Sequence, residues 1–167
     1  MTGAANSGWP TAELDSVRRL RVIASATRHP TYAERYFDVP LEQLWSVVSD
    51  LEHELPRIVP GLRSFTLTGG DGDRLPGQAV SSLGHRERFD VVLRPGWCLM
   101  QSRILTGGMA AVADGAGTRF AFFSSLRFPG GQVVGRVRRF RSAKRSGALL
   151  DRVQRRVEAP SVPGGAE

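Results

Sequence analysis

The segment Tyr36–Asp50 constrains the fold of this chain more than any other stretch. An extended run ends at Pro40, which has no N–H for a sheet and whose fixed φ suits the first turn of a helix. Four apolar residues then follow at the spacing of one helix face. They are Leu41, Leu44, Trp45 and Val48. The pattern predicts a strand that passes directly into a short amphipathic helix at 41–49.

Alternating apolar residues and turn signals predict an antiparallel sheet after this helix. A second short helix is expected at 51–58, because Pro56 and Pro60 bracket its end. The expected strands are 33–39, 62–68, 77–83, 86–94, 97–106 and 118–128, with a short strand possible at 109–113. Glycine-rich segments at 69–72, 107–108 and 115–117 supply the turns.

The last predicted element is a long helix over about 132–158. Its apolar residues recur at steps of three and four. They are Val133, Val137, Phe140, Ala143, Gly147, Leu150, Val153 and Val157. A sheet with one apolar face and a helix with an apolar stripe bury these surfaces against each other. The sequence therefore predicts an α+β fold in which a curved antiparallel sheet wraps around a long C-terminal helix.

The 167 residues suffice for one domain with some terminal excess. We assign residues 31–158 to this domain. Residues 1–30 form an N-terminal extension, partly disordered, with a helix possible at 11–26, and 159–167 form a flexible tail. No apolar run approaches the length of a membrane span, and the N-terminus lacks the order of a secretory signal. With one cysteine, Cys98, an internal disulfide is impossible, so we expect a cytoplasmic protein.

Two motifs, together with the order of elements, resemble the SRPBCC superfamily. The first is Phe37–Asp50, in which a strand ends at Pro40 before an apolar helix face that contains Trp45. The second is Gly115-Ala116-Gly117-Thr118-Arg119, which is similar to the family's Gly-x-Gly-Thr-Arg hairpin before the last strand. The resemblance covers about residues 33–158 and points to the polyketide cyclase/dehydrase-like branch. It implies the helix-grip fold, shared with START-type lipid-transfer domains and pollen-allergen-like proteins.

The resemblance implies that a small hydrophobic ligand, a lipid or an aromatic polyketide-like molecule, binds in an internal cavity. In this fold the core and the cavity wall are one surface, so alternating apolar residues serve either role. Trp45, on the apolar helix face, faces either cavity or core. The candidate ligand-binding residues are Trp45, Phe89, Val91, Leu93, Phe120, Phe122 and Phe140.

A cyclase or dehydrase activity of the polyketide type is the alternative hypothesis. It needs an inward donor and a base, and the candidates are Arg103 and His85. Both also fit a solvent-exposed position, so we favour binding without catalysis. A lone buried thiol such as Cys98 is usually inert. The three histidines lack metal-ligand spacing, and we expect neither a metal nor a cofactor.

The net charge of +7 is concentrated near the C-terminus, where residues 130–167 hold nine basic residues against three acids. Seven arginines lie mostly off the apolar stripe of the final helix. They are Arg136, Arg138, Arg139, Arg145, Arg152, Arg155 and Arg156. This face is either a solvated helix surface or a binding site for an anionic lipid, nucleic acid or acidic partner. An interaction protein is therefore the third hypothesis.

Overall fold

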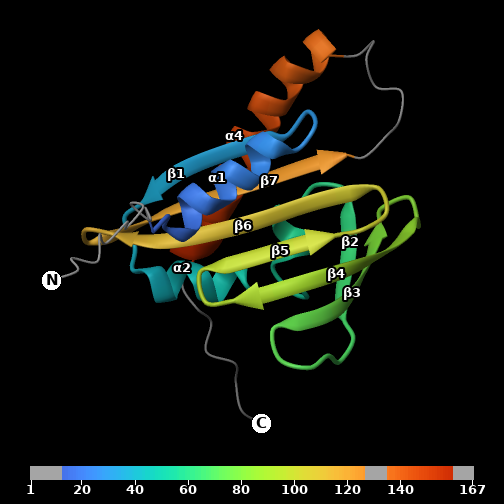
Figure 1. The fold of residues 1–167 in the computed structure, drawn as a ribbon, viewed down its shortest axis with the longest axis horizontal. Coiled ribbons are helices and arrows are strands. Elements are labelled where there is room, and N and C mark those ends of the chain that lie inside the picture. The colour runs from blue at the N-terminus through green and yellow to red at the C-terminus, as the bar shows by residue number, and fades with distance from the viewer. Residues whose placement is uncertain (1–12, 127–134, 160–167) are drawn as a thin grey trace, which may run out of the picture.

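One seven-stranded sheet organises the computed structural model, which describes residues 13–126 and 135–159 (Figure 1). The strands lie in the order β1-β7-β6-β5-β4-β3-β2, and every neighbouring pair is antiparallel. The strands are β1 Thr31–Phe37, β2 Leu62–Leu67, β3 Arg74–Ser81, β4 Arg86–Arg94, β5 Trp97–Gln101, β6 Leu105–Asp114 and β7 Gly117–Leu126. The helices are α1 Ser16–Ala26, α2 Leu41–Val48, α3 Leu55–Ile58 and α4 Gly135–Glu158.

Helices cover both faces of the sheet. Figure 1 shows α1 in front of β6 and β7, and part of α4 behind the sheet. The concave face packs against α2, α3 and the C-terminal half of α4, and α4 runs along the edge strand β1. The predicted α+β helix-grip architecture is confirmed. The long helix follows the β1 edge and the two short helices, which leaves the concave face of β2–β5 partly uncovered.

The junction between β1 and α2 forms as the sequence predicts. Pro40 precedes the first turn of α2 with φ −59°, and the helix buries Leu44 and Val48. The hydroxyl of Thr118 donates a hydrogen bond to the carbonyl of Val39 at 2.8 Å. The strand–Pro–helix motif and the Gly-x-Gly-Thr-Arg hairpin are therefore in direct contact, although 79 residues separate these two partners.

The predicted strand 97–106 is wrong, because the chain turns at 102–104 and divides it into β5 and β6. The hydroxyl of Ser102 accepts hydrogen bonds from the N–H groups of Ile104 and Leu105 at 3.3 and 3.0 Å. This local side-chain bond stabilises a turn in place of the ladder. Gly107 and Gly108 were expected to break the sheet, but both lie inside β6.

Two helix boundaries also differ from expectation. The second short helix has hydrogen-bonded turns from 51 onward, but is helical only over Leu55–Ile58. The N-terminal helix begins at Ser16, with Asp15 as its cap, in place of Thr11. The Asp15 carboxylate accepts a hydrogen bond from the Arg18 N–H at 2.8 Å, which satisfies a free donor of the first turn.

Helix α1 packs on the convex face of the sheet and forms a second apolar cluster. Its buried residues Val17, Leu20 and Ala24 contact small residues of β6 and β7. At Gly108 a Cβ atom would lie 3.1 Å from Leu20 Cδ1 and 2.9 Å from the Cys98 carbonyl oxygen. The glycine therefore permits a close approach of helix to sheet.

We predict that Gly108→Val lowers the free energy of unfolding by about 1–3 kcal/mol, because its side chain overpacks the contact with α1. Urea denaturation followed by circular dichroism measures the change. The matched control is Gly69→Val, since a Cβ at Gly69 meets nothing within 4 Å. Equal stability of the two variants would contradict this account of the glycine.

Candidate functional site

The concave face of the sheet is largely apolar over β2 to β7. Alternate residues of β2 to β7 point toward it, since successive side chains of a strand lie on opposite faces. Its buried members are Phe65, Val91, Cys98, Met109, Ala111, Phe120 and Phe122. Its half-buried members are Leu62, Leu67, Leu75, Ala79, Phe89, Leu93 and Met100. The half-buried residues all belong to β2–β5, the strands farthest from α4 in the order of the sheet.

One end of this face is closed by packed side chains. Leu44 and Val48 of α2 and Val153 of α4 are at most 1% exposed. Phe37 and Phe120 lie edge to face there, with ring centroids 6.0 Å apart. This part of the concave face is ordinary hydrophobic core.

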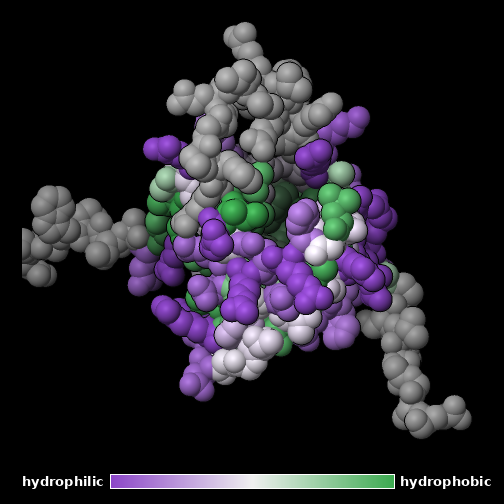
Figure 2. Space-filling view, turned by 90° about the vertical axis from the view of Figure 1, so that its right-hand side faces the viewer, coloured by the Kyte–Doolittle hydropathy of each residue, from purple (hydrophilic) through white to green (hydrophobic). Residues whose placement is uncertain are grey.

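The other end opens toward the β3–β4 and β5–β6 turns. Figure 2 views the molecule from this end and shows hydrophobic side chains in a recess, with hydrophilic residues below it. Phe89 is half-buried and packs against Phe65, with ring centroids 5.9 Å apart. We take this open, apolar end as the candidate ligand site.

The structure divides the candidate ligand residues into two groups. Val91 and Phe120 are at most 1% exposed and belong to the packed core. Phe122 is 7% exposed, whereas Phe89, Leu93 and Trp45 are half-buried at the edge of the same cluster. The side chain of Phe140 lies outside the described residues.

Sequence reasoning missed several members of this surface, among them Phe65, Leu67, Leu75 and Met100. The register supplies the signal for Leu75 and Met100, because they pair with Val91 on either side of β4. Paired residues of adjacent strands share a face. If Val91 is placed on the concave face, the register that the turns on both sides of β4 set therefore places Leu75 and Met100 on the same face.

Neither catalytic candidate is buried. Arg103 is exposed in the β5–β6 turn, where its backbone N–H donates to the Glu87 carboxylate at 3.2 Å. His85 is exposed just before β4, and its backbone N–H donates to the Ser81 hydroxyl at 3.1 Å. Gln101, which shares the parity of Leu99, is also exposed. The catalytic hypothesis for Arg103 and His85 stays a prediction.

Polar groups on the concave side have partners within the protein. Arg35 donates to Asp151 at 2.8 Å and to Gln154 at 3.3 Å, both on α4. The Cys98 thiol is fully buried, and burial raises its pKa to about 12. The thiol is therefore protonated at neutral pH and is not a nucleophile. Among the described residues, no cluster of three or more His, Cys, Asp or Glu side chains is arranged to hold a metal ion.

A separate hollow of about 610 Å³ lies along the β3–β5 strands. It is open to solvent, and its lining includes Gln78, Arg88, Asp90, Gln101 and Arg103. These residues alternate with the concave set along their strands or follow in the turn, so they belong to the outer side of the sheet. The lining also includes Phe89, which belongs to the concave set, so the hollow adjoins the apolar wall at this residue.

The arginines of α4 have several roles. Arg152 donates to the Ile58 carbonyl at 3.3 Å, and Arg156 forms an ion pair with Glu54. Arg145 and Arg155 are exposed. The side chains of Arg136, Arg138 and Arg139 lie outside the described residues. An anionic partner for this helix stays a prediction.

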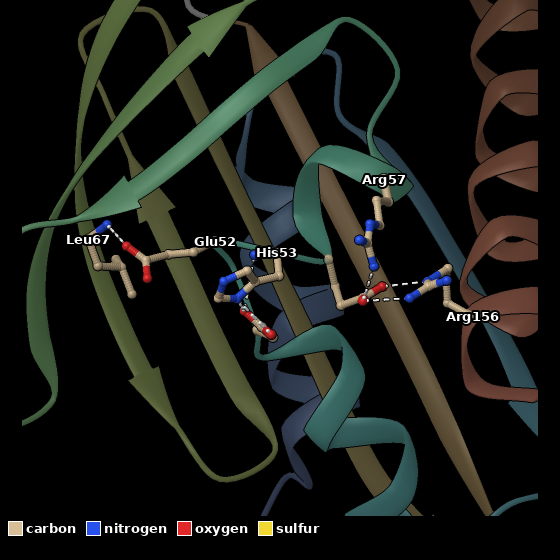
Figure 3. Close-up of polar contacts among 7 residues, drawn as sticks. Glu52, His53, Arg57, Leu67 and Arg156 are labelled. Carbon is tan, nitrogen blue, oxygen red and sulfur yellow. Dashed lines mark hydrogen bonds and ion pairs between the residues drawn. The ribbon is translucent and has the colours of Figure 1, made fainter. Parts of the chain in front are cut away.

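The loop between α2 and α3 holds the closed end together (Figure 3). Arg156 Nε and Nη2 donate to the two oxygens of Glu54 at 2.6 and 2.7 Å, and Arg57 donates to the same carboxylate at 3.0 Å. Glu52 accepts a hydrogen bond from the Leu67 N–H at 2.7 Å. These bonds join the loop to α4 on one side and to β2 on the other.

Comparison with known proteins supports the fold. No protein-family profile matches the sequence, and no curated protein is similar to it. Among solved structures, CC1736 from Caulobacter crescentus matches with a TM-score of 0.62 and 16% identity, covering 78% of this chain and 97% of that one. TTHA0849 from Thermus thermophilus matches with a TM-score of 0.58 and 19% identity, covering 79% of this chain and 99% of that one.

A third match is StfQ, a di-domain ARO/CYC protein from the steffimycin biosynthetic pathway, with a TM-score of 0.61 and 11% identity. The alignment covers 85% of this chain and 54% of that protein, about one of its two domains. These matches confirm the predicted fold. No helix within the described residues is long and apolar enough to cross a membrane, and a cytoplasmic location stays a prediction.

We predict that Glu54→Gln lowers the free energy of unfolding by about 1 kcal/mol at neutral pH, because it weakens the charged hydrogen bonds to α4. Arg156 holds the pKa of Glu54 below the ordinary 4.5. This stabilisation is therefore present above pH 4.5 and is lost as the pH falls through the folded-state pKa. Denaturant unfolding of both proteins across about pH 3–7 measures the difference.

The control is Glu13→Gln, which removes an exposed carboxylate outside this loop. It should leave stability unchanged. A gap between wild type and Glu54→Gln that stays constant down to about pH 3 would show that the ion pair is not its source.

Proposed function

We propose that this chain binds a small hydrophobic molecule at the open end of its concave sheet face. The observation that carries the proposal is a continuous apolar wall that the described residues only half cover. The half-buried wall residues include Leu75, Phe89, Leu93 and Met100. Contact between water and this apolar wall is unfavourable in free energy, and an apolar ligand that displaces the water removes this contribution.

The binding free energy of such a ligand depends on the apolar surface area that it removes from water. Removing about 200 Å² of apolar surface from water contributes about 5 kcal/mol before ordering costs. Micromolar affinity requires about 8 kcal/mol, so the ligand must bury its own surface as well. A molecule with an extended apolar body satisfies this requirement, whereas a small polar metabolite does not.

The side chains of the wall favour flat or flexible apolar ligands. The rings of Phe65 and Phe89 are tilted by 52° and offer aromatic surface to a planar molecule. Met100 and Met109 add unbranched, polarisable side chains that adapt to irregular shapes. A lipid chain and an aromatic polyketide-like molecule both fit this chemistry, and the second is also suggested by the ARO/CYC description of StfQ.

We predict that Met100→Gln weakens binding of the apolar dye 1-anilinonaphthalene-8-sulfonate. The amide has nearly the shape of the thioether, but it leaves a polar group unpaired against the ligand. A cost of about 1–3 kcal/mol corresponds to roughly 5- to 150-fold in Kd. A fluorescence titration measures the dissociation constant.

The matched control is Val92→Gln, a substitution on the opposite face of the neighbouring strand β4. It should bind the dye as wild type does. Native mass spectrometry of protein purified from its own host then identifies a retained molecule. A dye affinity that Met100→Gln leaves unchanged would refute binding at the concave face.

A further inference from the structure

Five segments form a rim around the open end of the concave face: residues 27–30, 60–63, 82–87, 101–105 and 126. Hydrogen bonds join them across the sheet. The Ser125 hydroxyl donates to the Arg28 carbonyl at 2.7 Å, and the Ser82 N–H donates to the Gly61 carbonyl at 2.9 Å. Arg103 is bonded to Glu87 through its backbone N–H. The rim is therefore one connected surface.

Exposed apolar side chains project from this rim. Leu83 is 84% exposed at the tip of the β3–β4 turn, and Ile104 is 41% exposed at the tip of the β5–β6 turn. Leu126, which pairs with Leu105 at the end of the sheet, is 42% exposed. A leucine so exposed contributes little to folding, and several apolar tips on one rim indicate a contact surface.

The charge of the rim is strongly positive. Its exposed basic residues are Arg28, His29, Arg63, His85, Arg86 and Arg103, and its sole acidic residue is Glu87. Among the described residues, none of the four guanidinium groups forms an ion pair, since the pairs present involve other arginines.

The opposite end of the sheet has the reverse charge. Its turns and the strand ends beside them carry Asp38, Asp71, Asp73 and Asp114 against Arg74 and Arg94, and Arg94 pairs with Asp73 at 2.7 Å. The turns at the two ends of the sheet therefore differ in the sign of their charge. A negative surface attracts the rim and repels the turns at the opposite end.

We propose that the rim docks on an anionic lipid bilayer, with Leu83 and Ile104 among the headgroups and the arginines against lipid phosphates. Apolar tips flanked by arginines match the two layers of a bilayer surface, an apolar interior beneath anionic groups. A nucleic acid accounts for the arginines but leaves the apolar tips without a partner. This docking rests on and extends the proposed ligand binding, because the open end of the recess then faces the acyl chains.

Flotation with two kinds of vesicle tests the docking: phosphatidylcholine alone, and phosphatidylcholine mixed with phosphatidylglycerol. Wild-type protein should float with the anionic vesicles at low salt and dissociate as salt rises. Arg86→Ala should weaken this binding about fivefold, the value of one arginine near an anionic surface. The double variant Leu83→Ser, Ile104→Ser should weaken it at all salt concentrations, because an apolar contribution is not screened.

Two controls lie away from the rim: Val22→Ser removes an exposed apolar residue of α1, and Arg74→Ala removes an exposed arginine at the start of β3. Both should bind as wild type does. The proposal is overturned if wild type does not float at low salt, floats equally with neutral vesicles, or loses binding equally in the controls. Dye titration in the absence of vesicles keeps this result separate from that of ligand binding.

Discussion

The alternation of side chains along β6 and β7 is the constraint on which the rest of the structure depends. In β7, Phe120 and Phe122 point into the concave cluster, whereas Ala121 and Phe123 point into the cluster beneath α1. The hairpin turn at Gly115-Ala116, where Gly115 has φ +61°, sets the register of these strands. A shift of one residue would exchange the two sets and remove both cores at once.

Patterns that depend on neighbouring residues could be predicted from the sequence. Alternation along 86–94 placed Phe89, Val91 and Leu93 together, and all three belong to the concave cluster. The spacing after Pro40 located α2, and the composition of 114–117 located the hairpin between β6 and β7. In each case a steric or periodic rule acts between residues that are close in the chain.

Features that depend on distant partners could not be predicted. From the sequence, Gly108 is interpreted as a turn residue. In the structure it lies under α1, and the absence of a side chain permits the close contact with this helix. Arg156 looks like part of a free basic face, although it binds Glu54, which lies 102 residues away. His85 and Arg103 have suitable chemistry for catalysis, but their strands end in exposed turns. Burial and pairing of side chains arise only in the folded chain, and they cannot be predicted from residue type or local sequence pattern alone.

The two ends of the sheet have different physical roles. At the closed end, Leu44, Val48 and Val153 pack without solvent, and Glu54 holds α4 through two charged hydrogen bonds. At the open end, Phe89 and Met100 stay half-buried. A packed end therefore positions an apolar surface that the described part of the chain leaves half-buried, and a hydrophobic ligand is the simplest partner for it.

The central claim is that this apolar surface takes up a ligand, and methyl-resolved NMR during titration with 1-anilinonaphthalene-8-sulfonate tests it most directly. The account predicts saturable shifts for the methyl groups of Leu75, Leu93 and Met100, while those of Leu20 and Ile23 in α1 stay unchanged. Shifts confined to the α1 cluster or to exposed Leu83, or no saturable shift, would contradict it.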